Sequence, residues 1–173
     1  MALDVPREGG FLGVPLLRLL AVLMVLAPLP LACASGSSDV QALSVHLFDS
    51  GEPVVTIDLP EDAAWVLQWR HSVTGILVKD YFGVQEGQMM LEQSHMPAFD
   101  AGLGHIPGRG RLESDGANGY WVRDIDEPIA GNRFVLRVGD VGVNDHTLIV
   151  AGQQVNLSTL VPRQRVVMTI GAP

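Results

Sequence analysis

Cysteine is almost absent from this sequence, whose one cysteine, Cys33, lies near the N-terminus. A single cysteine excludes a disulfide within the chain and argues against a metal site built from cysteines. Aromatic residues make up only 6% of the chain, and there is no internal repeat, heptad pattern or long run of one charge. We therefore expect neither a coiled coil nor a repeat protein.

Basic residues are scarce, with 11 Lys and Arg against 19 Asp and Glu, which gives a net charge of −8. They are scattered and cluster only as two pairs, Arg109 with Arg111 and Arg163 with Arg165. Because so few cations are available to neutralise phosphates, we expect neither nucleic acid nor anionic lipid as the main partner.

Long helical patterns are also lacking, whereas glycine is abundant at 19 residues. A length of 173 residues suits one domain with a real core. Short alternating or β-branched segments between turn residues predict strands at 43–47, 54–59, 65–73, 76–84, 89–95, 120–122, 133–138, 146–150, 154–157 and 165–170. The sequence thus predicts an all-β, single-domain fold that is sandwich-like or barrel-like.

An apolar segment dominates the N-terminal region. Arg7 and Arg18 precede an uninterrupted apolar run over residues 19–27, which is too short for a permanent membrane-spanning helix and leads to small residues. We predict a signal peptide over residues 1–34, a flexible Ser/Gly-rich tether over 35–42 and the all-β domain over 43–173. An exported, extracytoplasmic protein is expected.

Two processing routes overlap at the end of this segment. Leu31-Ala32-Cys33 resembles the end of a bacterial lipobox, which predicts cleavage before Cys33 and lipidation of that cysteine. Ala32-Cys33-Ala34 is also a signal-peptidase site, which predicts cleavage after Ala34 and a secreted protein. We expect the lipid-anchored form, because the cysteine ends the apolar run and the tether follows it.

The stretch from Trp65 to Gly75 is the predicted central strand. With a period of two, Trp65, Leu67, Trp69, His71 and Val73 share one face, which is rich in core-type residues. The stretch ends in a dense polar run, Arg-His-Ser, before a Thr-Gly turn. A binding site at the end of this strand is therefore a reasonable hypothesis.

Two other segments carry candidate polar groups: the glycine-rich loop over 97–111 and the strand start at position 146. Long loops in compact domains are usually functional or disordered, and this one has residues of the buried type. We predict one binding patch made of Arg70, His71, Ser72, Asp100, Gly102, Gly104, His105, Arg109, Arg111 and His146.

Alternative chemistries use the same residues. His71, His105 and His146 offer imidazoles for a divalent metal ion, although no two of them have the spacing of a compact metal motif; packing histidines are the expected reading. Ser72, beside His71, is a candidate nucleophile of a serine hydrolase, but no nucleophile-elbow pattern surrounds it. We expect no cofactor and no catalytic residue.

Several motifs in order resemble one family. They are Trp69-Arg-His-Ser-Val73, Asp80-Tyr-Phe82, Phe99-Asp-Ala-Gly-Leu-Gly104 with Pro107-Gly108, Asp115-Gly116, Leu136-Arg-Val-Gly139 and His146-Thr-Leu148. Together they resemble the bacterial domain-of-unknown-function family 1850, small exported proteins often encoded beside TRAP transporters of the TAXI type. Many members have an acidic residue after His-Ser-Val, where this chain has Thr74.

The resemblance implies an accessory part in solute uptake. We therefore expect a non-enzymatic accessory or solute-related binding module of a TRAP (TAXI) uptake system. Its expected partner is the membrane or solute-binding component of that transporter. The alternatives are a periplasmic metal-binding protein that uses the motif histidines and a small serine hydrolase.

Overall fold

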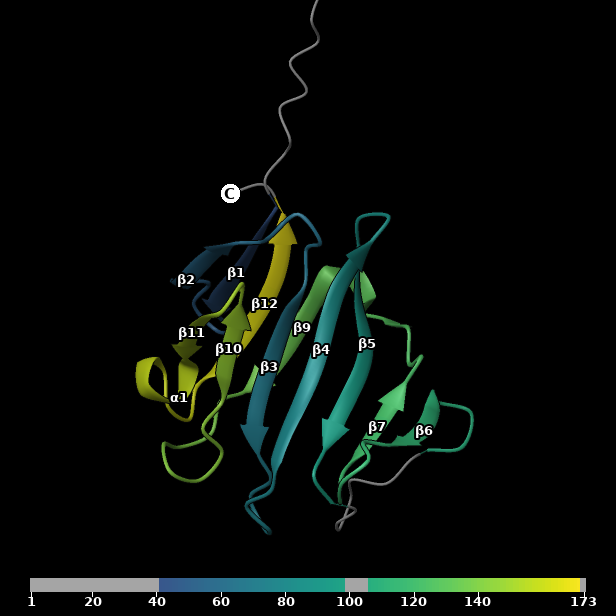
Figure 1. Cartoon of the computed structure of the whole chain (residues 1–173). Coiled ribbons are helices and arrows are strands. Elements are labelled where there is room, and N and C mark those ends of the chain that lie inside the picture. The colour runs from purple at the N-terminus through teal and green to yellow at the C-terminus, as the bar shows by residue number, and fades with distance from the viewer. Residues whose placement is uncertain (1–40, 99–105, 172–173) are drawn as a thin grey trace, which may run out of the picture. The chain divides into compact units, whose positions relative to one another are not determined.

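The computed structural model describes residues 41–98 and 106–171, and their strands form two antiparallel sheets (Figure 1). The first sheet has the order β2-β1-β12-β9. Its strands are β1 (Ala42–Leu47), β2 (Pro53–Asp58), β9 (Arg133–Arg137) and β12 (Arg165–Gly171). The turn of 3₁₀ helix Ala130–Asn132 leads into β9.

The second sheet has the order β11-β10-β3-β4-β5-β7-β6, and the short β8 pairs with β5. Its strands are β3 (Trp65–Arg70), β4 (Leu77–Gln85), β5 (Gln88–Met96), β6 (Arg111–Ser114), β7 (Tyr120–Arg123), β8 (Glu127–Pro128), β10 (Thr147–Val150) and β11 (Gln153–Asn156). One helical turn, α1 (Leu157–Leu160), follows β11. The predicted all-β fold is confirmed, and it is a sandwich.

The main core lies between the two sheets, because both contribute their alternate apolar residues to one cluster. Leu43, Val45 and Met168 of the first sheet pack in the same cluster as Trp65 and Leu148 of the second. Across the sandwich, Phe82 of β4 meets Phe134 of β9 edge-on at 5.2 Å between ring centroids. In Figure 1, β9 accordingly lies behind β3 and β4.

A smaller core cluster lies beside the main one, made of Val78, Met96, Val122 and Ile125. Trp69 of β3 packs against both clusters. The inner face of the second sheet is therefore apolar on both sides of Trp69.

The central strand is shorter than predicted, since β3 ends at Arg70 instead of Val73. The chain turns at once: Gly75 N–H donates to the carbonyl of His71 at 2.8 Å, and Gly75 has a φ of +71° that favours glycine. Val73 is 78% exposed as a result. The prediction that His71 and Val73 extend the core face of the strand is wrong.

The predicted signal peptide, with Cys33, and the predicted tether up to residue 40 lie outside the described residues. Ala42, which was predicted as the last residue of the tether, is instead the buried first residue of β1. In the part of the chain that is described, no helix is long and apolar enough to cross a membrane.

Candidate functional site

Trp69 connects segments that are far apart in the sequence. Its indole stacks on the ring of His146 with 6.4 Å between centroids, and it lies at the same distance from the tilted ring of His71. Its Nε1–H donates to Oδ2 of Asp80 at 2.8 Å. Any site here is therefore organised around this one aromatic ring.

The register of the strands determines where the Asp80 side chain points. Asp80 pairs with Leu67 on β3 and with Ser94 on β5. Paired residues of antiparallel strands share a face, and both of these partners are buried. The Asp80 carboxylate therefore points between the sheets, where Ser94 Oγ donates to its Oδ1 at 2.6 Å.

The hydrogen-bond donors of Asp80 are neutral. Burial raises the pKa of the Asp80 carboxyl above its usual range, while the hydrogen bonds from Ser94 and Trp69 and the charge of Arg109 lower it in part. Arg109 itself is bound to Glu127 at 2.7 Å. Among the described residues no basic side chain forms an ion pair with Asp80.

His146 is held in one tautomer by the backbone. The N–H of Gly139 donates to Nδ1 of His146 at 3.0 Å, and a backbone N–H can only donate. Nδ1 is therefore the unprotonated nitrogen, and Nε2 carries the hydrogen. Burial lowers the pKa of His146, with Asp145 opposing the shift, so burial and this hydrogen bond both favour the neutral ring.

The loop between β9 and β10 fixes the position of His146. A Cβ at Gly139 would lie 2.1 Å from Oδ1 and 2.5 Å from Cβ of Asn144, so the loop closes tightly only with glycine there. Asn144 Nδ2 donates to the carbonyl of Arg70 at 3.1 Å, which ties the loop to the end of β3. The His146 N–H donates to Oγ of the fully buried Ser158 at 3.0 Å.

Trp69, Asp80 and His146 border a pocket of about 240 Å³ between the sheets, which we call the intersheet pocket. Its described lining consists of Leu67, Trp69, Asp80, Phe134, Leu136 and His146. Four apolar side chains form the walls, and one carboxylate and one imidazole supply the polar groups. An apolar hollow with a few convergent polar groups is typical of a small-ligand site, although this one is small.

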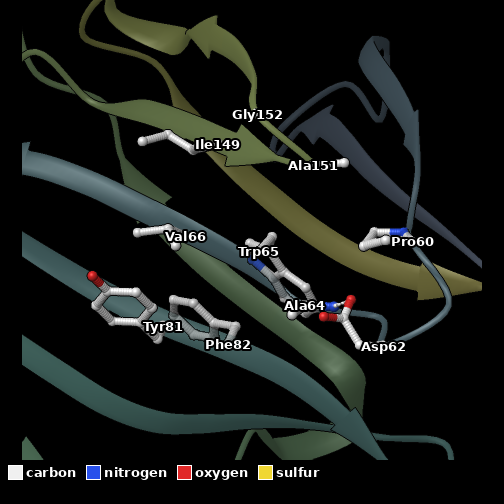
Figure 2. A pocket seen from close by; sticks show the side chains of 10 residues that line it. All are labelled: Pro60, Asp62, Ala64, Trp65, Val66, Tyr81, Phe82, Ile149, Ala151 and Gly152. Atoms are coloured by element: carbon white, nitrogen blue, oxygen red, sulfur yellow. Dashed lines mark hydrogen bonds between the residues drawn. The ribbon is translucent and has the colours of Figure 1, made fainter.

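A second hollow of about 350 Å³ lies near the opposite end of β3 and β4. Figure 2 shows its lining, in which the stacked rings of Trp65 and Phe82 lie 5.4 Å apart and Asp62 stands at the side. Asp62 is exposed, and no described pair of polar side chains converges here as Asp80 and His146 do. The intersheet pocket is therefore the better candidate for a binding site.

The structure brings part of the predicted patch together. Arg70 ends β3 and its Nε lies 3.5 Å from Asp145 Oδ2. His71 follows the strand, and its ring and that of His146 both contact Trp69. Ser72 is exposed in the turn that follows, where Nδ1 of His71 is 3.1 Å from the hydroxyl of Thr74. His71 is thus engaged by Thr74 and gives no support to a hydrolase built on Ser72.

The predicted arginines of the glycine-rich loop are already paired with acids of the same chain. Arg109 binds Glu127, and Arg111 lies 3.2 Å from Asp124 and 3.4 Å from Glu113. Neither lines the intersheet pocket in its described part. The other predicted members of the patch from this loop, Asp100, Gly102, Gly104 and His105, lie outside the described residues.

The metal alternative finds no support in the geometry of His146. To ligate a metal through Nε2, the ring would need its hydrogen on Nδ1, which faces the N–H donor of Gly139. No group of three or more His, Cys, Asp or Glu residues in the described part of the chain could hold a metal ion. His105 lies outside this part.

Asp80 stands in one of the family motifs but was left out of the predicted patch, although a signal for its burial was present. In the strand from 77 to 85, Val78, Asp80 and Phe82 follow each other with a period of two. Val78 and Phe82 are both 2% exposed, so a carboxylate between them points to the core. A lone acid on the apolar face of a strand is the pattern that would have identified this site.

The fold is an all-β sandwich with a small pocket between its two sheets. The family model described as "Domain of unknown function (DUF1850)" matches residues 66–157. The chain therefore belongs to this family, and the match spans Trp69, Asp80 and the His146 loop. Searches of curated proteins and of solved structures gave no match.

Proposed function

We propose that this protein is an exported, non-enzymatic binding module that serves a membrane uptake system of the TRAP (TAXI) type. In this proposal the intersheet pocket is the place where the domain binds a solute or a group of a partner. The observation that carries the binding function is the convergence of Asp80 and His146 on an apolar hollow with Trp69 between them. The link to the transporter rests on the family resemblance.

Three features support binding over catalysis. The described lining of the pocket has no hydroxyl, thiol or amine nucleophile. The Asp80 oxygens are each held by a donor, and the tautomer of His146 is fixed by Gly139. Fixed polar groups on apolar walls orient a ligand at low entropic cost, which is what a binding site requires.

Anchoring at the membrane is the second part of the proposal. Lipidation of Cys33 would hold the domain at the membrane, and the predicted tether that precedes β1 would let it reach a transporter component. A net charge of −8 favours a basic contact surface on the partner.

Gene deletion and affinity purification test this function together. Deletion is expected to reduce transporter-dependent solute uptake, and the wild-type protein expressed in trans should restore it. The tagged full-length protein should retain a transporter component from detergent-solubilised membranes at low salt and lose it at high salt. Unchanged uptake after deletion, together with no co-purifying transporter component, would show that the accessory function is wrong.

A further inference from the structure

The charge balance of the intersheet pocket is incomplete. Asp80 is held by the neutral donors Trp69 and Ser94, and no basic side chain of the described residues pairs with it. Among the described residues, Arg109 is the cation that acts on it from a distance, and Arg109 is bound to Glu127 at 2.7 Å. A carboxylate below the protein surface is stable when it binds a proton or meets a cation.

The walls of the pocket suit a cation that carries alkyl groups. The Trp69 indole and the Phe134 ring present aromatic surface, and Leu67 and Leu136 add aliphatic surface. A cation gains electrostatic attraction over an aromatic face, and its alkyl groups gain from apolar contact. A volume of about 240 Å³ admits one small group.

His146 is compatible with such a ligand because its ring is neutral. The Gly139 N–H occupies Nδ1, and burial works against a charge on the ring. His146 therefore adds no repelling charge, and its Nε2–H remains a donor for an acceptor on the ligand. An anionic ligand would face Asp80 with no described cation in the pocket wall.

We infer that the intersheet pocket binds a small organic ammonium group, with the Asp80 carboxylate as counter-ion and the Trp69 ring as its wall. This inference rests on the proposed binding function and names its ligand class. The ammonium group belongs either to a free amine solute or to a lysine side chain of a partner protein. Both share the charge, the size and the alkyl attachment that the pocket recognises.

The indole N–H of Trp69 provides a direct probe, because it is bonded to Asp80. We would record its NMR signal in the ¹⁵N-labelled protein, assigned with Trp69→Phe, while adding tert-butylammonium or its neutral counterpart tert-butanol. The charged compound should shift the signal saturably and bind at least about tenfold more tightly than the alcohol. Equal shifts from the two compounds, or no shift from either, would overturn the inference.

Variants then locate the counter-ion. Asp80→Asn should weaken tert-butylammonium binding at least about tenfold, whereas Asp58→Asn removes the same charge from an exposed site and should bind as the wild type does. Wild-type affinity in a folded Asp80→Asn protein would contradict the inference. Comparison of n-butylammonium with N-acetyl-lysine-methylamide separates the two sources. A pocket for a free amine solute should bind n-butylammonium more tightly. A pocket for a partner's lysine should bind both compounds with similar affinity.

Failure of the ammonium inference and failure of the proposed transport function give different results. If tert-butylammonium binds through Asp80 but deletion leaves uptake unchanged, the ligand class stands and the transport function is wrong. If uptake requires the protein but no ammonium compound binds, the ligand class is wrong and the transport function stands.

Discussion

Asp80 depends on Ser94 and Trp69 for its position, since its hydrogen bonds in the described structure come from these two side chains. Hydrogen bonds to a charged group are worth more than neutral ones, and more still away from bulk water. The side chain of Ser94 is therefore as much a part of the site as the pocket wall, although it is not among the pocket's described lining residues.

Ser94→Ala tests this dependence. Loss of the hydroxyl removes the 2.6 Å hydrogen bond, and we expect the free energy of unfolding at neutral pH to fall by about 1.5–3 kcal/mol. The matched control is Ser44→Ala, which removes a 3.3 Å hydroxyl contact with Thr56 near the surface and should cost under about 0.5 kcal/mol. Urea denaturation measures both, and equal losses would mean that Ser94 does not support Asp80.

The neutral His146 ring makes stability depend on pH. Folding lowers its pKa below the ordinary 6.5, so the stabilisation is fully present above pH 6.5 and is lost as the pH falls through the lowered value. We expect the wild type to lose stability more steeply than His146→Gln between about pH 7.5 and about pH 5. If urea denaturation gives the wild type and His146→Gln the same dependence of stability on pH, folding does not lower the pKa of His146.

At the scale of elements, the loop between β9 and β10 positions the site, because it joins His146 to the end of β3. The backbone N–H of Arg70 donates to the carbonyl of Asn144 at 2.6 Å, and the Asn144 side chain returns a hydrogen bond to the Arg70 carbonyl. Gly139 permits this arrangement, since any Cβ there would collide with Asn144.

Gly139→Ala should therefore displace Asn144 and loosen His146. We expect a loss of about 1–3 kcal/mol in unfolding free energy, as for other overpacked positions. Gly171→Ala is the control: a Cβ there meets no atom within 4 Å, so its effect should stay within about 0.5 kcal/mol. If thermal or chemical denaturation finds the two variants alike, the tight closure of the loop is not a constraint.

Strand alternation and turn residues were enough to predict most of the fold. The Glu86-Gly87 turn, for example, has φ values of 51° and 77°, as a two-residue hairpin of type I′ requires. β6 was missed because its four residues are all exposed and polar apart from Leu112, so they carry no alternation. The end of β3 was misplaced because Val73 matched the strand period, yet the tight turn at Gly75 prevails.

The site was harder to predict than the fold, because its residues meet only through the pairing of strands. Phe134 and Leu136 come from the opposite sheet, and no local pattern links them to Trp69. Of the predicted patch, Arg70, His71 and His146 lie near one another, as their contacts with Trp69, Asn144 and Asp145 show. The arginines at 109 and 111 attracted attention by their charge, but intramolecular acids pair with both.

In the proposed function, lipidation at Cys33 decides where the whole molecule acts. If Cys33 is lipidated, the mature protein should sediment with membranes, and Cys33→Ser should shift it to the soluble fraction. Mass spectrometry of the mature N-terminus provides the second readout. A mature protein that begins at Ser35 would contradict lipidation and leave a secreted binding module.

In the proposed function, Asp80 is needed because the intersheet pocket binds what the uptake system uses. The most direct test measures transporter-dependent solute uptake in a deletion strain that expresses the wild type, Asp80→Asn or Asp58→Asn at equal levels. We predict that Asp58→Asn restores uptake as the wild type does and that Asp80→Asn, although folded and exported, restores little of it. Full restoration by Asp80→Asn would contradict the account.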